Sequence, residues 1–184
     1  MSHLLYCFIS NFSYTYVYAA DETSVWLDPS SGTCVSEKGA KIVTVLSTGH
    51  EKARVIVLLT ARSDGFKLPP FVLLPRKRPV PEIEKRFKNK LVLAWYGKSW
   101  MDNELTAKYL NEVLFLLILV YLKIQIFGNF HFGSRLLLWD SYRCHLSSDT
   151  KLVLKRLAIH TAVMPGGTTK YIQVYFLIKF YSKV

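Results

Sequence analysis

The chain has 184 residues, 51% of them hydrophobic and 14% aromatic, so it can bury one substantial core and is not a disordered polypeptide. Its net charge of +11 favours a polyanionic partner, nucleic acid before a membrane surface. Its three cysteines are odd in number and widely spaced, which excludes a disulfide framework and a cysteine-rich zinc site.

The first twenty residues contain no Lys, Arg, Asp or Glu and are rich in Tyr and Phe. A secretory signal would begin with basic residues and continue with an unbroken apolar stretch, and both are missing here. Residues 14–27, which include all but the last residue of the sequence AADETSVWLD, instead predict a first strand. Either Asp21 or Glu22 places an acid in an apolar context there, whereas Asp28 precedes Pro29 and is typical of a turn.

Four more strands are expected in the first half of the chain. Residues 39–48 and 53–66 are rich in β-branched residues, and the second of these segments turns at Ser63-Asp64-Gly65. A return strand over residues 69–75 follows this turn, and a short strand over residues 90–97 comes later. This order predicts an antiparallel start to the sheet.

The stretch from Arg62 to Lys98, which includes the last two of these strands, is basic and contains several prolines. From Arg62 to Lys98 there are ten Lys or Arg and three acids. Five prolines break the stretch, so we expect no amphipathic helix, and the cluster favours contact with the phosphates of nucleic acid. A solvated basic surface, or a nuclear-import-like PRKRP signal, is the alternative. The residues expected to contact nucleic acid are Arg76, Lys77, Arg78, Lys85, Arg86, Lys88 and Lys90.

Two helices are expected in the second half. Asp102 or Asn103 can cap the first, and Ser147 can cap the second, over the sequence LSSDTKLVLKRLA. A last strand, HTAVMP, ends before Gly166 and Gly167. Antiparallel strands followed by strand–helix alternation predict an α/β fold with a mixed sheet and flanking helices.

An unusually apolar block occupies residues 113–127. Its unbroken part, residues 113–122, is ten residues long, whereas a helix that crosses a bilayer needs about 20. The block therefore favours a buried helix or an inserted segment over a membrane span.

Residues 136–139 (LLLW) are apolar without interruption and lead directly into Asp140. Such a run is typical of a central strand that is covered on both faces, which places Asp140 at the rim of the sheet. Ligands bind at this rim in open α/β sheets, although a turn or helix-capping role is the alternative. Arg143 and His145 follow closely, and they could approach a substrate phosphate or serve only packing and surface roles.

Several long motifs occur in an order that resembles one family. The similarity extends from about residue 20 to residue 173, and it is to the DDE endonuclease domain of pogo- and Tigger-type transposases in the Tc1/mariner superfamily, which is related to the centromere protein B and jerky group. The motifs are DETSVWLDPSSGTCVSEKGAK, TGHEKARVIVLLTARSDGFKLPPFVLLPRKRP, WMDNELTAKYLNEV, LLLWDSYRCHLS and TAVMPGGTTKYIQ.

The resemblance implies a ribonuclease H-like fold in which acidic residues on a mixed sheet bind two Mg²⁺ or Mn²⁺ ions. The family's first acid, in its DET motif, falls on Asp21, and its second, in WDS, falls on Asp140. These two residues are thereby expected to be catalytic and to bind metal. The implied chemistry is DNA cleavage and strand transfer in the nucleus, with DNA as the partner and no small-molecule substrate.

The chain departs from the family at three places. The position of the third acid is occupied by Phe176, which has no oxygen to offer a cation, and Glu22 should point to the opposite face of its strand from Asp21. An extra apolar segment occupies residues 114–126, and residues 1–19 match nothing in the family. We therefore expect a DDE domain over residues 20–184 that is truncated at its C-terminus, from a truncated, misjoined or decayed transposase sequence.

These departures predict impaired catalysis. One alternative is a non-enzymatic DNA-binding or interaction domain derived from a transposon. A weaker alternative is a membrane-associated basic protein built around the apolar block.

Overall fold

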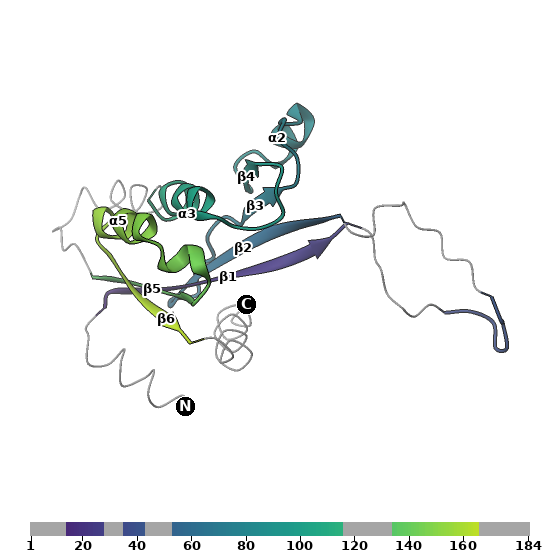
Figure 1. Cartoon of the computed structure of the whole chain (residues 1–184), viewed down its shortest axis with the longest axis horizontal. Helices are drawn as coiled ribbons and strands as arrows, with labels where there is room; N and C mark the ends of the chain where they lie inside the picture. Colours follow the sequence, from purple (N-terminus) through teal and green to yellow (C-terminus); the bar gives the residue numbers. More distant parts are fainter. Residues whose placement is uncertain (1–13, 28–34, 43–52, 116–133, 166–184) are drawn as a thin grey trace.

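The structure is a computed structural model that describes residues 14–27, 35–42, 53–115 and 134–165 (Figure 1). The strands are β1 (Tyr16–Trp26), β2 (Arg54–Arg62), β3 (Phe71–Leu74), β4 (Val92–Trp95), β5 (Arg135–Asp140) and β6 (Ile159–Met164). The helical elements are α2 (Pro81–Phe87), α3 (Asn103–Tyr109), the π-helical turn η1 (Leu110–Phe115), the 3-10 turn η2 (Arg143–Leu146) and α5 (Ser148–Arg156).

All six strands form one mixed sheet in the order β4-β3-β2-β1-β5-β6. β1 is antiparallel to β2, and β2 is antiparallel to β3. The pairs β3–β4, β1–β5 and β5–β6 are parallel. The α/β mixed sheet is therefore as expected, and it brings β1 beside β5 although the two strands are far apart in sequence.

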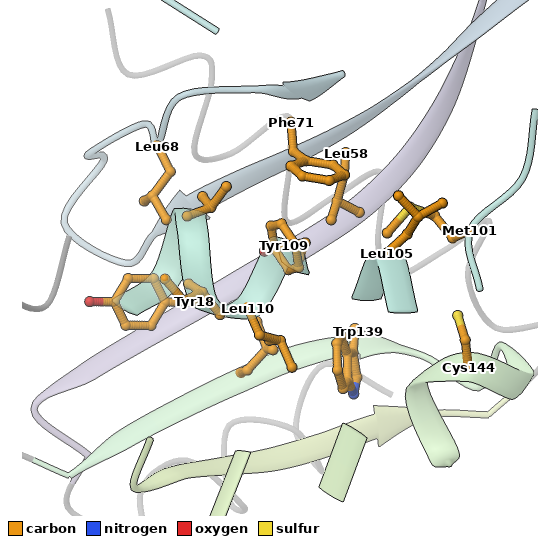
Figure 2. Packing of buried hydrophobic residues seen from close by; sticks show 14 of the residues in the cluster. Tyr18, Leu58, Leu68, Phe71, Met101, Leu105, Tyr109, Leu110, Trp139 and Cys144 are labelled. Carbon is orange, nitrogen blue, oxygen red and sulfur yellow. The ribbon is translucent and has the colours of Figure 1, made fainter. Parts of the chain in front are cut away.

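The main core lies between the sheet and the helical elements α3, η1 and α5, of which α3 and α5 are on the same side of the sheet in Figure 1. Tyr109 of α3 is fully buried there, and its hydroxyl lies 2.6 Å from the hydroxyl of Thr60 on β2. Leu137 and Trp139 of β5 face this core, as Figure 2 shows for Trp139. The sheet thus packs its central strands directly beneath the helices.

The opposite face of the two central strands is also apolar. Val17 and Ala19 of β1 form a second buried cluster with Leu136 and Leu138 of β5. Residues on both faces of β5 are therefore buried, which confirms the prediction that the run before Asp140 is a central strand.

The predicted helix starts are confirmed by their capping hydrogen bonds. Asp102 caps α3, because its Oδ1 accepts a hydrogen bond from the Leu105 N–H at 3.0 Å. Ser147 caps α5, because its hydroxyl accepts one from the Thr150 N–H at 3.2 Å. In each case a short polar side chain supplies the acceptor that the first turn of a helix lacks.

Two predictions need correction. The strand expected over residues 39–48 is absent from residues 39–42, which form a turn and a bend, and the remainder of it lies outside the described residues. A helix, α2, does form in the basic stretch despite its prolines. Pro81 begins this helix, where a missing N–H costs no intrahelical hydrogen bond, and no residue of α2 is buried.

Part of the unusual sequence lies outside the described residues. Val113 and Leu114 begin the apolar block and are buried, but residues 116–127 are not described. Residues 1–13 are not described either, whereas Tyr16–Ala19 belong to β1. Within the described ranges, no helix has both the length and the apolar character that a membrane crossing requires.

Candidate active site

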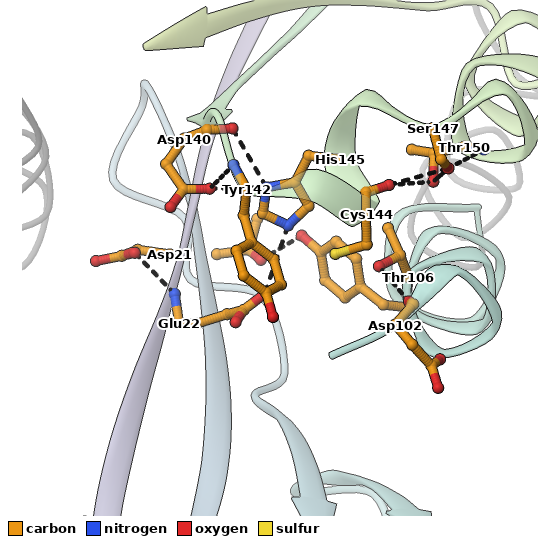
Figure 3. A network of polar contacts seen from close by, with 12 residues as sticks. Asp21, Glu22, Asp102, Thr106, Asp140, Tyr142, Cys144, His145, Ser147 and Thr150 are labelled. Carbon is orange, nitrogen blue, oxygen red and sulfur yellow. Dashed lines mark hydrogen bonds and ion pairs between the residues drawn. The ribbon is translucent and has the colours of Figure 1, made fainter. Parts of the chain in front are cut away.

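The pairing of β1 with β5 places the two predicted acids on one face of the sheet. Val17 lies opposite Leu136 and Ala19 lies opposite Leu138, in parallel register. Side chains alternate between faces along a strand, so Asp21 and Asp140, each two positions further on, share this face. The two acids therefore lie on neighbouring strands of the sheet. Figure 3 shows them together where β5 ends.

Asp140 is fixed by two hydrogen bonds to the same oxygen. Its Oδ1 accepts from the backbone N–H of Tyr142 at 3.1 Å and lies 2.8 Å from Nδ1 of His145. The hydrogen bond with His145 holds the pKa of Asp140 below its usual value, in spite of partial burial. Within the described part of the chain no hydrogen bond reaches Oδ2, so that oxygen is available to a ligand.

Asp21 is in a less favourable environment for a charge. Its Oδ1 accepts a hydrogen bond from the Glu22 N–H at 2.8 Å, and no described residue donates one to its Oδ2. Burial, followed by the charges of Asp140 and Glu22, raises the pKa of Asp21 to about 6 against the effect of this hydrogen bond. The two strand acids therefore lie close enough for one charge to oppose the other.

Glu22 points away from Asp21, toward the helical side of the sheet, as alternation along β1 predicts. Its Oε1 is buried without a hydrogen bond and lies 3.4 Å from Nε2 of His145. Glu22 therefore contacts the site through His145 rather than through Asp21.

His145 lies between Asp140 of β5 and Glu22 of β1. The sequence alone did not predict that His145 contacts both acids. Its ring is 6% exposed and stacks on Trp139, with 4.3 Å between ring centroids and 6° between planes. Burial alone would lower the pKa of His145, but its hydrogen bonds, that with Asp140 foremost, raise the pKa to about 11. Arg143, the other residue suggested near Asp140, is exposed.

The donor set of this face fits a hard divalent cation, because it consists of carboxylate oxygens. Asp21 and Asp140 each present one oxygen without a hydrogen bond from the described residues. Within those residues, however, no group of three His, Cys, Asp or Glu is arranged to bind a metal ion. Phe176, at the predicted position of the third acid, lies outside the described residues.

The predicted nucleic-acid contacts lie at the far edge of the sheet from β5. The seven predicted contact residues lie between β3 and β4. Their side chains are all exposed, and none forms an ion pair with another described residue. They are Arg76, Lys77, Arg78, Lys85, Arg86, Lys88 and Lys90. Arg62, at the start of the basic stretch, differs from them because it is buried and paired with Asp64 at 2.6 Å.

Two known proteins are similar to this chain in sequence. The chain is 27% identical over 155 residues to the mouse protein "Pogo transposable element with KRAB domain" and 26% identical to the human protein of that name. Each alignment covers 84% of this chain and 24% of the relative, so the chain spans about a quarter of these relatives' length.

A solved structure, the Mos1 transposase paired-end complex with left transposon end, has the same fold. Its TM-score is 0.53 at 9% sequence identity, and the match covers 98% of this chain and 46% of that one. The fold is thereby the ribonuclease H-like mixed sheet that the resemblance implied.

The family model for the DDE superfamily endonuclease matches residues 52–176. The match begins after β1, so it includes Asp140 but not Asp21. The resemblance seen in the sequence is confirmed, and the chain belongs to the DDE superfamily endonuclease family as a transposase-derived, endonuclease-like domain.

Proposed function

We propose that this domain carries a metal-dependent DNA endonuclease site formed by Asp21 and Asp140, and that this site is catalytically impaired in the present chain. The observation that carries the proposal is the placement of the two carboxylates on one face of adjacent strands. Bound Mg²⁺ or Mn²⁺ would supply an activated water or 3′-hydroxyl for attack on a phosphodiester.

The residues of the chain would prepare this chemistry by orienting oxygens. Asp21 and Asp140 would bind the ion through their Oδ2 atoms. The Oδ1 atom of Asp21 already accepts a hydrogen bond from a backbone N–H, and that of Asp140 accepts one from a backbone N–H and one from His145. The low pKa of Asp140, which results from its hydrogen bond with His145, keeps this ligand ionised. A cation beside Asp21 would offset the repulsion that Asp140 and Glu22 exert on it.

Impairment follows from Phe176 at the position where the family resemblance expects a third acid. Two-metal catalysis fixes both ions relative to the attacking and leaving oxygens, and a phenyl ring supplies no ligand. A misplacement of about 1 Å can already lower the rate about a hundredfold. Glu22 is a poor substitute, since it points to the other face of β1 and contacts His145.

The test is the nicking of a supercoiled plasmid by the purified chain with Mg²⁺ or Mn²⁺. We expect the unmodified chain to nick no faster than Asp140→Ala, because both lack a complete ligand set. Phe176→Asp should gain activity that the double variant Phe176→Asp/Asp140→Ala lacks. Metal-dependent nicking by the unmodified chain that Asp140→Ala abolishes would refute the impairment.

DNA binding without cleavage is the second candidate function, and the seven exposed cations between β3 and β4 favour it. Their charges are not neutralised by neighbouring acids of the described chain, so they can contact phosphates. Such a domain would act on DNA in the nucleus and would need no small-molecule substrate. Its specificity for sequence should be low, because phosphate contacts carry no base information.

A further inference from the structure

The chain between β5 and α5 folds back beneath Asp140. The η2 turn follows Asp140 closely, and the N–H of His145 donates to the carbonyl of Tyr142 at 2.9 Å. This turn places the imidazole against Trp139 in a parallel stack, and the ring of Tyr142 meets the imidazole edge-on, with 5.9 Å between ring centroids and 71° between planes. Packing against Trp139 and Tyr142 therefore holds the plane of the imidazole, in addition to the contacts of its nitrogen atoms.

The two ring nitrogens face two different acids. Nδ1 lies 2.8 Å from Oδ1 of Asp140, and Nε2 lies 3.4 Å from Oε1 of Glu22 (Figure 3). A carboxylate oxygen accepts, so Nδ1 donates to Asp140. His145 thereby connects the end of β5 with the middle of β1. The proposed metal site depends on the pairing of these two strands.

This contact determines which oxygen of Asp140 remains available. The bonds from His145 and from the Tyr142 N–H both end on Oδ1, and Oδ2 lies on the side of Asp21. Without the imidazole, a single backbone hydrogen bond would remain, and the carboxylate could rotate about its side-chain torsions.

We propose that His145 is a positioning residue that aims Oδ2 of Asp140 at the metal position, with Glu22 contacting the far side of the imidazole. This inference rests on the proposed metal site. Residues that orient a metal ligand typically change metal affinity by about 10–100-fold when they are removed. If His145 only filled space beside Trp139, the metal affinity would not depend on which of its nitrogen atoms is kept.

Two substitutions separate these roles, because each preserves one nitrogen position. His145→Asn retains an amide N–H near Nδ1, whereas His145→Gln retains one near Nε2. The test is the affinity of the full chain for Mn²⁺, measured by electron paramagnetic resonance. Thermal unfolding of each variant checks that it is folded. We expect His145→Asn to stay within about threefold of the unmodified chain and His145→Gln to lose about tenfold or more.

The unmodified chain provides a second measurement that needs no substitution. Saturating Mg²⁺ should shift the side-chain ¹⁵N resonances of His145, while those of His160, which is exposed on β6 and packs beside Tyr14, should not move. Equal Mn²⁺ affinities for the Asn and Gln variants, or His145 resonances that ignore Mg²⁺, would overturn the positioning role.

The variant Asp140→Ala separates this failure from failure of the proposed function. If Mn²⁺ binding depends on Asp140 but not on which nitrogen of residue 145 is kept, the metal site stands and the role of His145 is wrong. If Mn²⁺ binding is the same in the unmodified chain and in Asp140→Ala, the metal site itself is refuted, and the inference is refuted with it.

Discussion

Asp21 and Asp140 have the same side chain but opposite electrostatic surroundings. His145 donates to Asp140 and lowers its pKa, whereas burial, followed by the charges of Asp140 and Glu22, raises the pKa of Asp21 to about 6. The fold therefore favours the ionised form of one acid and opposes that of the other. A carboxylate retained against such repulsion is characteristic of functional sites rather than of stabilising ones.

Replacement of Asp21 by Asn should therefore stabilise the metal-free chain. Asn has nearly the same shape and still accepts the hydrogen bond from the Glu22 N–H, but it carries no charge to be repelled. We expect the free energy of unfolding in EDTA at neutral pH to rise by about 1 kcal/mol, a value reduced for screening by solvent. Urea unfolding followed by circular dichroism measures this change.

The matched variant Asp140→Asn should act in the opposite direction. It weakens the hydrogen bond from His145, and we expect a loss of about 1–3 kcal/mol, as for other hydrogen bonds of charged groups. Two variants that change stability equally, and in the same direction, would contradict the electrostatic difference between the acids.

Among the elements, α5 is important because the turn η2 that carries His145 leads directly into it. Ser147 caps α5 and also donates to the carbonyl of Cys144 at 3.1 Å, so it joins the turn to the helix. Thr150 is buried in the first turn of α5 and donates to the same carbonyl at 2.7 Å. The start of α5 thus sets the position of the η2 turn.

Removal of the Ser147 hydroxyl should destabilise the chain by about 1 kcal/mol, the usual cost of a lost helix N-cap. Ser148, the next residue, is exposed and provides the control. We expect Ser147→Ala to lower the midpoint of urea unfolding and Ser148→Ala to leave it unchanged. The same midpoint for both variants would mean that the cap contributes nothing.

The basic segment between β3 and β4 is the element that we expect to contact DNA. If it contacts phosphates, the variant Arg76→Ala/Lys77→Ala/Arg78→Ala should weaken duplex binding and reduce the slope of log affinity against log salt by about three or less. Fluorescence anisotropy at several salt concentrations measures both quantities.

A control with the same change of charge removes three exposed lysines of α3 and α5, namely Lys108, Lys151 and Lys155. This control should change the slope much less, because its effect is not localised at the proposed contact. Equal slopes for the two triple variants would show that only net charge matters.

The sequence predicted those features that depend on residues close together in the chain. The capping residues Asp102 and Ser147 act over a few residues, and the structure confirms them. Local strand patterns predicted the six strands of the sheet, but they also predicted a strand over residues 39–48 that is absent from residues 39–42. The helix α2 was missed because five prolines were taken to break the segment, although Pro81 is compatible with a helix start. The contact of His145 with Glu22 joins residues that are distant in sequence, so only the β1–β5 register could reveal it.

Over the whole molecule, the acidic and basic regions lie at different places on one sheet. Asp21 lies on β1, and the basic segment adjoins β4, with β2 and β3 between them. At about 4.8 Å per strand, β1 and β4 are about 14 Å apart across the sheet, or about four steps of a DNA duplex at 3.4 Å each. One short stretch of DNA could therefore contact both regions.

The account depends most on the claim that Asp21 and Asp140 together bind a divalent cation. The direct measurement is a crystal structure of the full chain grown with Mn²⁺, with anomalous scattering used to locate the metal. We predict an anomalous peak about 2.0–2.6 Å from a carboxylate oxygen of both residues, within the range of hard-cation ligands. A well-ordered Asp21 and Asp140 with no peak between them, at Mn²⁺ concentrations that produce peaks elsewhere, would contradict the account.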